Sequence, residues 1–174
     1  MTSHLKEIMK DPDIQNIVDL QLYPVGEMHK NSAGDDMICS GGIKECELHR
    51  YFACFLQQEK KDNVNNPMPL LDFIDCMENN ENSEEIERKL MSCVSDVKRR
   101  QDLQLCHHVE SFDLLVTLKK IEETITTGWF PYVLVNNKVL GNAQEGLAME
   151  DITSAICKSF TGKKEVKIHC NIDY

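Results

Sequence analysis

The residues of this sequence with the widest range of possible chemistry are its cysteines, because a thiol can act as a nucleophile, a metal ligand or half of a disulfide. No two of them are spaced as CxxC, which argues against a zinc ribbon or finger. Their number is even, so we expect a framework of up to four disulfides, with buried reduced thiols as the alternative. Their spacing alone does not assign the pairs. The eight cysteines are Cys39, Cys46, Cys54, Cys76, Cys93, Cys106, Cys157 and Cys170.

One further cluster could in principle hold a metal ion, namely Cys106, His107 and His108. Two adjacent histidines on a helix or turn point apart, and no other ligands follow at a spacing typical of zinc sites. We therefore predict no metal site, and nothing else in the sequence indicates a cofactor.

Length and charge narrow the class of protein. The chain has 174 residues, which is the size of one domain, and 41% hydrophobic with 28% charged residues is typical of globular proteins. Its formal net charge of −10 repels phosphate backbones, so nucleic acid is not an expected partner. No apolar run approaches the roughly 20 residues of a membrane span. Disulfides predict an oxidising compartment, yet residues 1–10 lack the apolar region of a signal peptide, so we expect a removed leader or an incomplete chain.

The elements that would position the cysteines follow from hydrophobic periodicity. Val18, Leu20 and Leu22 alternate with polar neighbours, which predicts a strand over residues 17–23. The turn residues Asn136 and Asn137 predict a hairpin over residues 132–140. Residues 31–42 and 57–69 are predicted as loops. Helices are predicted from apolar stripes at residues 3–10, 43–56, 70–77, 84–97, 114–125 and 149–160.

Residues 39–54, CSGGIKECELHRYFAC, resemble the signature C-Q-H-G-x2-E-C-x2-N-x4-C of the gamma-interferon-inducible lysosomal thiol reductase (GILT) family. Ser40 and Gly41 replace its Gln-His, and His49 replaces its Asn. Residues 130–136, FPYVLVN, are similar to the family's V-P-W-V-V-V-N/D segment, and residues 155–160, AICKSF, to its I-C-K-x-[FY]. All eight cysteines fall where family members carry one. The matching signature positions are Cys39, Gly42, Glu45, Cys46 and Cys54.

The resemblance implies an α/β fold: a single domain over residues 1–174, with a thioredoxin-like sheet and a helical, disulfide-rich insertion at about residues 39–125. A strand, hairpin and helix over residues 130–162 would complete it. The implied activity is reduction of protein disulfides by thiol–disulfide exchange, in a lysosomal or secreted protein. Its partners would be disulfide-bonded protein substrates or peptides. The implied substrate-facing edge is formed by Phe130, Pro131 and Tyr132.

The sequence departs from the family at the reactive group itself. Residues 2–5, TSHL, are similar to those that follow the family's CxxC, and no CxxC is present, so we expect no catalytic residue in this chain. The family counterparts of Cys39 and Cys46 are expected to be structural, and His49 to be solvated or a cap. Two alternatives remain open. The sequence is a truncated form of a working reductase, or it is a non-catalytic thioredoxin-like module that binds extended peptides or partner proteins.

Overall fold

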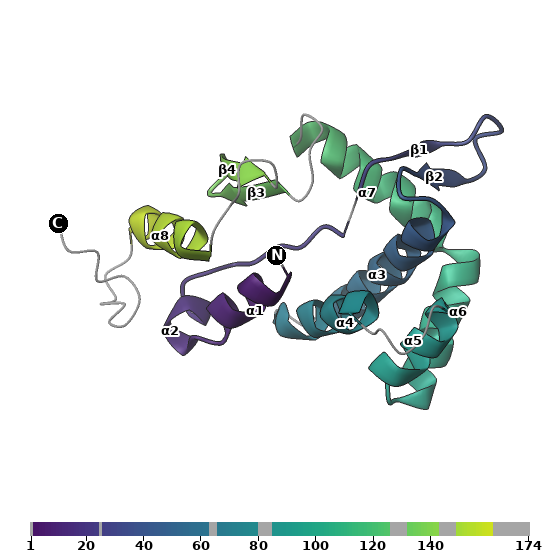
Figure 1. Cartoon of the computed structure of the whole chain (residues 1–174), viewed down its shortest axis with the longest axis horizontal. Helices are drawn as coiled ribbons and strands as arrows, with labels where there is room; N and C mark the ends of the chain where they lie inside the picture. The colour runs from purple at the N-terminus through teal and green to yellow at the C-terminus, as the bar shows by residue number, and fades with distance from the viewer. Residues whose placement is uncertain are drawn as a thin grey trace. The chain divides into compact units, whose positions relative to one another are not determined.

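A computed structural model of the chain describes residues 2–24, 26–62, 66–79, 85–125, 132–142 and 149–161. The chain divides into two compact units. Unit 1 combines Met1–Gln21 with Gly128–Tyr174, and unit 2 is the continuous segment Leu22–Thr127. The described residues are mostly helical (Figure 1).

Unit 2 consists of a short hairpin and five helices packed around the longest of them, α3 (Figure 1). In the hairpin, Met28 lies opposite Cys39 in an antiparallel pair. Helix α3 contacts the other four helices and the second strand, so it is the centre of the unit. The elements are β1 (Met28–Lys30), β2 (Met37–Cys39), α3 (Ile43–Lys61), α4 (Met68–Asn79), α5 (Ile86–Cys93), α6 (Val97–Val109) and α7 (Ser111–Ile125).

Helix α3 is buried on two sides, whereas its apolar stripe predicts one buried face. On one side Phe52 and Phe55 pack on Phe73 of α4, with ring centroids 5.9 Å and 4.2 Å apart. On the other side Ala53 and Cys46 belong to a second apolar cluster formed with the hairpin and α7. Because both clusters include residues of α3, the two halves of the unit 2 core cannot form independently of this helix.

Local sequence explains where these helices begin. Gly42 precedes α3 with a φ of 85°, a conformation that L side chains rarely adopt. Asp96 caps α6, because its carboxylate accepts a hydrogen bond from the backbone N–H of Arg99 at 2.7 Å. The expected helix over residues 84–97 therefore ends earlier, because α5 covers Ile86–Cys93 and Val97 instead begins α6.

Three disulfides join described residues of unit 2 to one another. Cys39 bonds to Cys46, Cys54 to Cys106, and Cys76 to Cys93. In unit 1, Cys157 is also disulfide-bonded. Cys170 lies outside the described residues.

Unit 1 brings together elements from both ends of the sequence. Helix α1 contacts α2 and α8, and α8 contacts β3, which pairs with β4 in a hairpin. The hairpin turn contains Asn136 and Asn137, with φ of 50° and 61°, as a two-residue turn of this kind requires. The elements are α1 (Thr2–Met9), α2 (Pro12–Gln15), β3 (Tyr132–Val135), β4 (Lys138–Asn142) and α8 (Met149–Ser159).

Several sequence expectations need correction. Residues 18–24 have no regular secondary structure although their burial alternates, and they pair with no described strand, so the expected strand over residues 17–23 does not form. A period of two reports burial on one face and says nothing about a hydrogen-bonding neighbour. The expected loop at residues 31–42 contains β2, and the expected loop at residues 57–69 contains the last turn of α3 and the first residues of α4.

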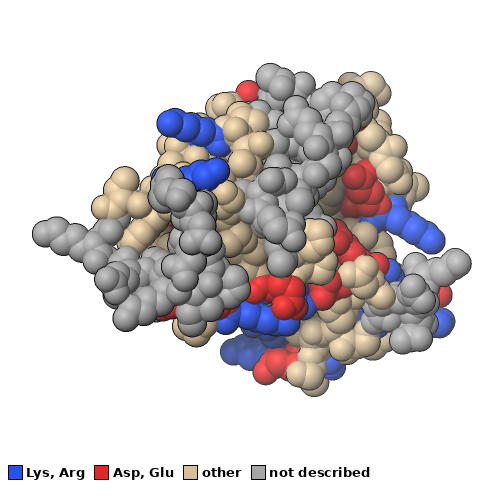
Figure 2. Space-filling view, turned by 60° about the vertical axis from the view of Figure 1, so that its left-hand side comes forward, with Lys and Arg blue, Asp and Glu red and all other residues tan. Residues whose placement is uncertain are grey.

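The two sheets described here have two strands each. The wider thioredoxin-like sheet and the single-domain organisation stay predictions. No helix in the described part of the chain is long and apolar enough to cross a membrane. On the face drawn in Figure 2, acidic and basic side chains lie next to one another, and the described residues form no broad basic area there.

The two longer disulfide loops lead to a prediction on stability. The Cys54–Cys106 bridge spans 52 residues and the Cys76–Cys93 bridge spans 17. Loop-closure entropy then predicts that C54A/C106A lowers the free energy of unfolding by about 4 kcal/mol and C76A/C93A by about 3 kcal/mol. Because Cys54 is fully buried, its replacement should also remove core contacts, which widens the difference between the two variants. Urea unfolding of the two double variants measures it, and an equal or reversed order would contradict the prediction.

Candidate functional site

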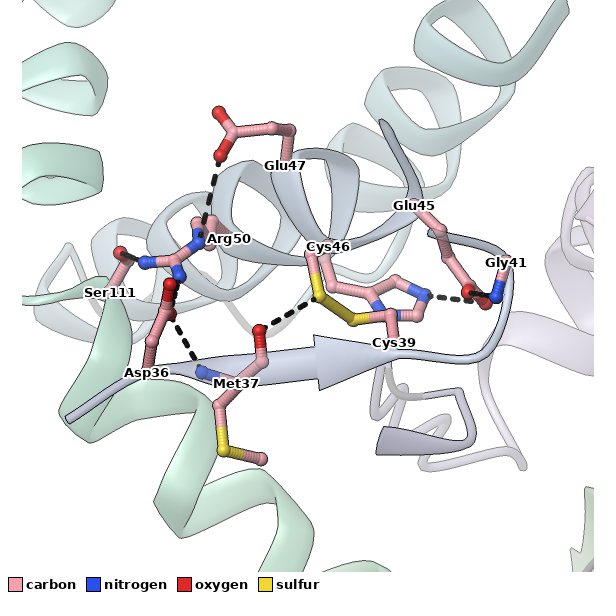
Figure 3. The surroundings of a disulfide bond; sticks show 10 residues. Asp36, Met37, Cys39, Gly41, Glu45, Cys46, Glu47, Arg50 and Ser111 are labelled. Atoms are coloured by element: carbon pink, nitrogen blue, oxygen red, sulfur yellow. Dashed lines mark hydrogen bonds and ion pairs between the residues drawn. A yellow bond between two sulfur atoms is a disulfide. The ribbon is translucent and has the colours of Figure 1, made fainter. Parts of the chain in front are cut away.

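The candidate site is the disulfide between Cys39 and Cys46 at the start of α3 (Figure 3). Cys39 is the last residue of β2, and Cys46 is the fourth residue of the helix. Both side chains are buried, whereas the loop that joins the strand to the helix, residues 40–42, is exposed. The bridge therefore lies beneath a short loop that contains two glycines.

An imidazole and a carboxylate lie beside this disulfide. The Nδ1 atom of His49 is 3.9 Å from Sγ of Cys39, and its Nε2 atom is 3.9 Å from Oε1 of Glu45. The other carboxylate oxygen of Glu45 accepts a hydrogen bond from the backbone N–H of Gly41 at 2.5 Å. Burial lowers the pKa of His49, and the negative charge of Glu45 opposes that shift. Carboxylate, imidazole and sulfur therefore follow one another in space.

Two glycines allow the backbone to approach these side chains closely. A Cβ at Gly26 would lie 2.6 Å from Cε1 of His49 and 2.9 Å from the nearer Glu45 oxygen. A Cβ at Gly41 would lie 2.6 Å from the other Glu45 oxygen. A larger residue at either glycine would therefore displace the side chain of His49 or Glu45 from its present position.

A second polar cluster anchors β2 to α3 and α7 (Figure 3). Arg50 donates to Oγ of Ser111 at 3.0 Å and to the carboxylate of Asp36, and Ser111 donates to the carbonyl of His107 at 2.5 Å. Asp36 also accepts from the backbone N–H of Met37 at 2.7 Å. The guanidinium of Arg50, on the helix that carries Cys46, thus holds Asp36, the residue just before β2.

His107 of α6 packs against α3 through Glu47 and Tyr51. Its Nε2 atom is 2.7 Å from Oε2 of Glu47, and its ring stacks on Tyr51 with centroids 4.4 Å apart. Burial lowers the pKa of His107, while Glu47 acts in the opposite direction. Burial and the charges of Glu87 and Glu47 raise the pKa of Tyr51 to about 12. Both rings therefore contribute to α3–α6 packing mainly in their neutral forms near pH 7.

The structure brings together four of the five signature positions. Cys39, Gly42, Glu45 and Cys46 meet at the start of α3, whereas Cys54 lies further along this helix in the core. The polar residues around Arg50 were not predicted, since they come from elements far apart in the sequence. The only sequence signal was the spacing of Glu47 and Arg50 by three residues on one helix.

The expected substrate-facing edge is only partly visible. Tyr132 begins β3, and Phe130 and Pro131 lie outside the described residues, so this edge stays a prediction. In the cluster considered for a metal, Cys106 is engaged in a disulfide and His107 in its contact with Glu47. No group of three or more metal-ligating side chains occurs among the residues that the structure describes.

The Arg50 cluster can be tested with a conservative change. We expect Arg50→Lys to lower the free energy of unfolding by roughly 1–2 kcal/mol, because a lysine cannot bond Ser111 and Asp36 in the same fork. The matched control is Arg88→Lys, whose exposed pair with Glu85 should contribute less than about 0.5 kcal/mol. Chemical denaturation of both variants gives the comparison, and equal effects would refute an anchoring role for Arg50.

His107 predicts a pH dependence of stability. Its lowered pKa means that, between that pKa and the ordinary value of 6.5, the His107 imidazole is protonated more in the unfolded chain than in the folded chain. The stability that depends on neutral His107 is therefore fully present above this pH range and is lost as the pH falls through it. We expect His107→Gln to flatten the decline of unfolding free energy between pH 7 and pH 5, and the exposed His4→Gln to leave it unchanged. Thermal unfolding of the wild type and both variants across this range gives the comparison. The same slope of stability against pH in His107→Gln as in the wild type would contradict the prediction.

Comparison with known proteins agrees with the signature at this site. No curated protein matches the chain. The family model described as gamma interferon inducible lysosomal thiol reductase (GILT) matches residues 1–97, which is more than half of the sequence and includes the whole of β2, α3, α4 and α5. Members of this family are lysosomal thiol reductases, and this chain belongs to the GILT family.

Proposed function

We propose that this protein takes part in the reduction of disulfides in protein substrates by thiol–disulfide exchange. The observation that carries the proposal is the family match over residues 1–97. The signature within that match forms an organised site, in which Cys39, Cys46 and Glu45 meet at one helix start. The family and the disulfides also favour an oxidising compartment, so we propose a lysosomal or secreted location.

We further propose that unit 1 is the thioredoxin-like part of the molecule and unit 2 its helical insertion. Unit 1 is assembled from the two ends of the sequence, and unit 2 is one continuous segment between them. A fold interrupted by an insertion divides in this way. The contacts of α8 with α1 and with β3 support this assignment, because they join the first helix to the last strand–hairpin–helix.

In this assignment the present residues supply the scaffold and the substrate-facing edge at residues 130–132. Exchange needs a thiolate to attack the substrate disulfide, and the 174 residues contain no CxxC. The sulfurs of the three described disulfides of unit 2 are already bonded to one another. We therefore propose that reduction of protein substrates requires a dithiol that these residues do not contain.

An insulin-reduction assay tests this proposal. The chain of 174 residues is compared with a version extended upstream from its own gene, in the presence of a low-molecular-weight thiol. We expect substrate reduction above the thiol background only for an extended version that carries a CxxC. The matched control is the same extended version with both cysteines of that motif changed to serine.

The other outcomes separate the alternatives. Activity of the unextended chain would overturn the claim that it lacks a nucleophile for protein substrates. Inactivity of both versions, together with binding of an extended peptide, would favour a non-catalytic interaction module. The absence of a CxxC is the sequence observation that favours that second function.

A further inference from the structure

We propose that the Cys39–Cys46 disulfide is itself a thiol–disulfide exchange site for low-molecular-weight thiols. His49 would act there as the proton acceptor, with Glu45 as its positioning residue. This goes beyond the proposed function, which requires a CxxC for protein substrates, and does not depend on it.

The three described disulfides of unit 2 differ in the polar side chain that lies beside their sulfurs. Only Cys39–Cys46 has an imidazole nitrogen beside a sulfur, the Nδ1 atom of His49 at 3.9 Å. At Cys54–Cys106 the described polar side chain in contact with a sulfur is the amide of Gln57, 3.9 Å from Sγ of Cys106. At Cys76–Cys93 it is the hydroxyl of Ser92, 4.0 Å from Sγ of Cys93. Neither an amide nor a hydroxyl accepts a proton near neutral pH as an imidazole does.

The imidazole is also held in a defined orientation. Glu45 lies on the Nε2 side of His49 and is itself fixed by the backbone N–H of Gly41. The backbone at Gly26 lies against the Cε1 edge of the ring, so close that a Cβ there would be 2.6 Å from Cε1. Glu45 is the charged group that faces the ring among the described residues, and it favours the imidazolium form. Nδ1 is thereby left directed at Cys39.

The location of the bridge favours a small partner. Cys39 is 3% exposed and Cys46 is 6% exposed, so a folded protein substrate could not reach the sulfurs. The overlying residues 40–42 are exposed and consist of a serine and two glycines, so this loop itself places no large side chain over the bridge. Cys46 lies within the first four residues of α3, where the helix dipole favours a thiolate.

The exchange can be written with atoms and electrons balanced. An incoming thiol transfers its proton to Nδ1 of His49, and its sulfur bonds to Sγ of Cys39, the sulfur beside that nitrogen. The bond between the two protein sulfurs breaks, and Cys46 leaves as a thiolate at the start of α3. A second thiol then attacks the mixed disulfide at the sulfur of the first thiol. Sγ of Cys39 departs and takes the proton held by His49, and the proton of the second thiol passes to the Cys46 thiolate. Two thiols are oxidised to one small disulfide, and the protein disulfide is reduced by two electrons.

The test measures which disulfide of the native chain opens first. The 174-residue chain is incubated with reduced glutathione at pH 7, quenched at intervals with an alkylating reagent and analysed by peptide mass spectrometry. Exposure alone predicts that Cys76–Cys93 opens first, because its two side chains are the less buried. We expect instead that Cys39–Cys46 opens at least about tenfold faster, as an adjacent proton acceptor would allow.

Variants assign the effect to His49. We expect His49→Asn to slow the opening of Cys39–Cys46 about tenfold or more at pH 7 and to leave a pH profile between pH 5 and pH 8 that follows only the thiolate fraction of glutathione. Opening of Cys76–Cys93 should be unchanged in the same sample. Glu45→Gln should shift this pH profile with a smaller loss of rate. The matched control is His29→Asn, which alters an exposed histidine on β1 and should have no effect.

Three results would overturn the proposal. They are earlier opening of Cys76–Cys93, a wild-type opening rate in His49→Asn, and opening of Cys39–Cys46 only together with loss of the far-ultraviolet circular dichroism signal. None of these readouts involves reduction of a protein substrate. Failure of this proposal can therefore be distinguished from failure of the proposed function in the insulin assay.

Discussion

The structure of unit 2 depends on the burial of α3 along two faces. Phe52 and Phe55 pack towards α4, while Ala53 faces the cluster built with the hairpin and α7. The Cys54–Cys106 bridge fixes the middle of this helix to α6, and the buried carboxylate of Glu59 pairs with Arg99 near its end. A helix held at its middle and end in this way has little freedom to rotate or slide. Its first turns therefore have a fixed position, which is what a site built there requires.

The site uses this fixed helix directly. Glu45, Cys46 and His49 are neighbours on α3, so helix geometry brings them to one end of the helix, and the backbone at Gly26 and Gly41 packs against two of their side chains. Only Cys39 comes from another element, and β2 is attached to α3 twice, through the disulfide and through the Arg50 cluster. Because the two attachments differ in chemistry, loss of the disulfide leaves the Arg50 linkage in place. The sulfur of Cys39 then need not move far from Cys46.

The sequence predicted the helices better than it predicted their contacts. The stripe around Phe52 and Phe55 was enough to place α3, because a period near 3.6 reports one buried face. The strand over residues 17–23 was wrong, since alternation at Val18 and Leu20 reports burial without identifying a pairing partner. The cysteine count predicted disulfides and could not choose the pairs. The approach of His49 to Cys39 depends on the backbone at Gly26, which no local pattern in the sequence encodes.

The three described disulfides of unit 2 close loops of very different length, and this difference bears on what each can do. Loop-closure entropy makes a bridge more stabilising as its loop lengthens. Cys54–Cys106 spans 52 residues, whereas Cys39–Cys46 spans only 7. The short bridge removes the least freedom from the unfolded chain, so its reduction costs the folded state least. A disulfide whose short loop contributes little to stability, beside an imidazole and a helix start, meets the physical conditions for reversible exchange, whereas a long-loop bridge in the core is suited to holding helices together.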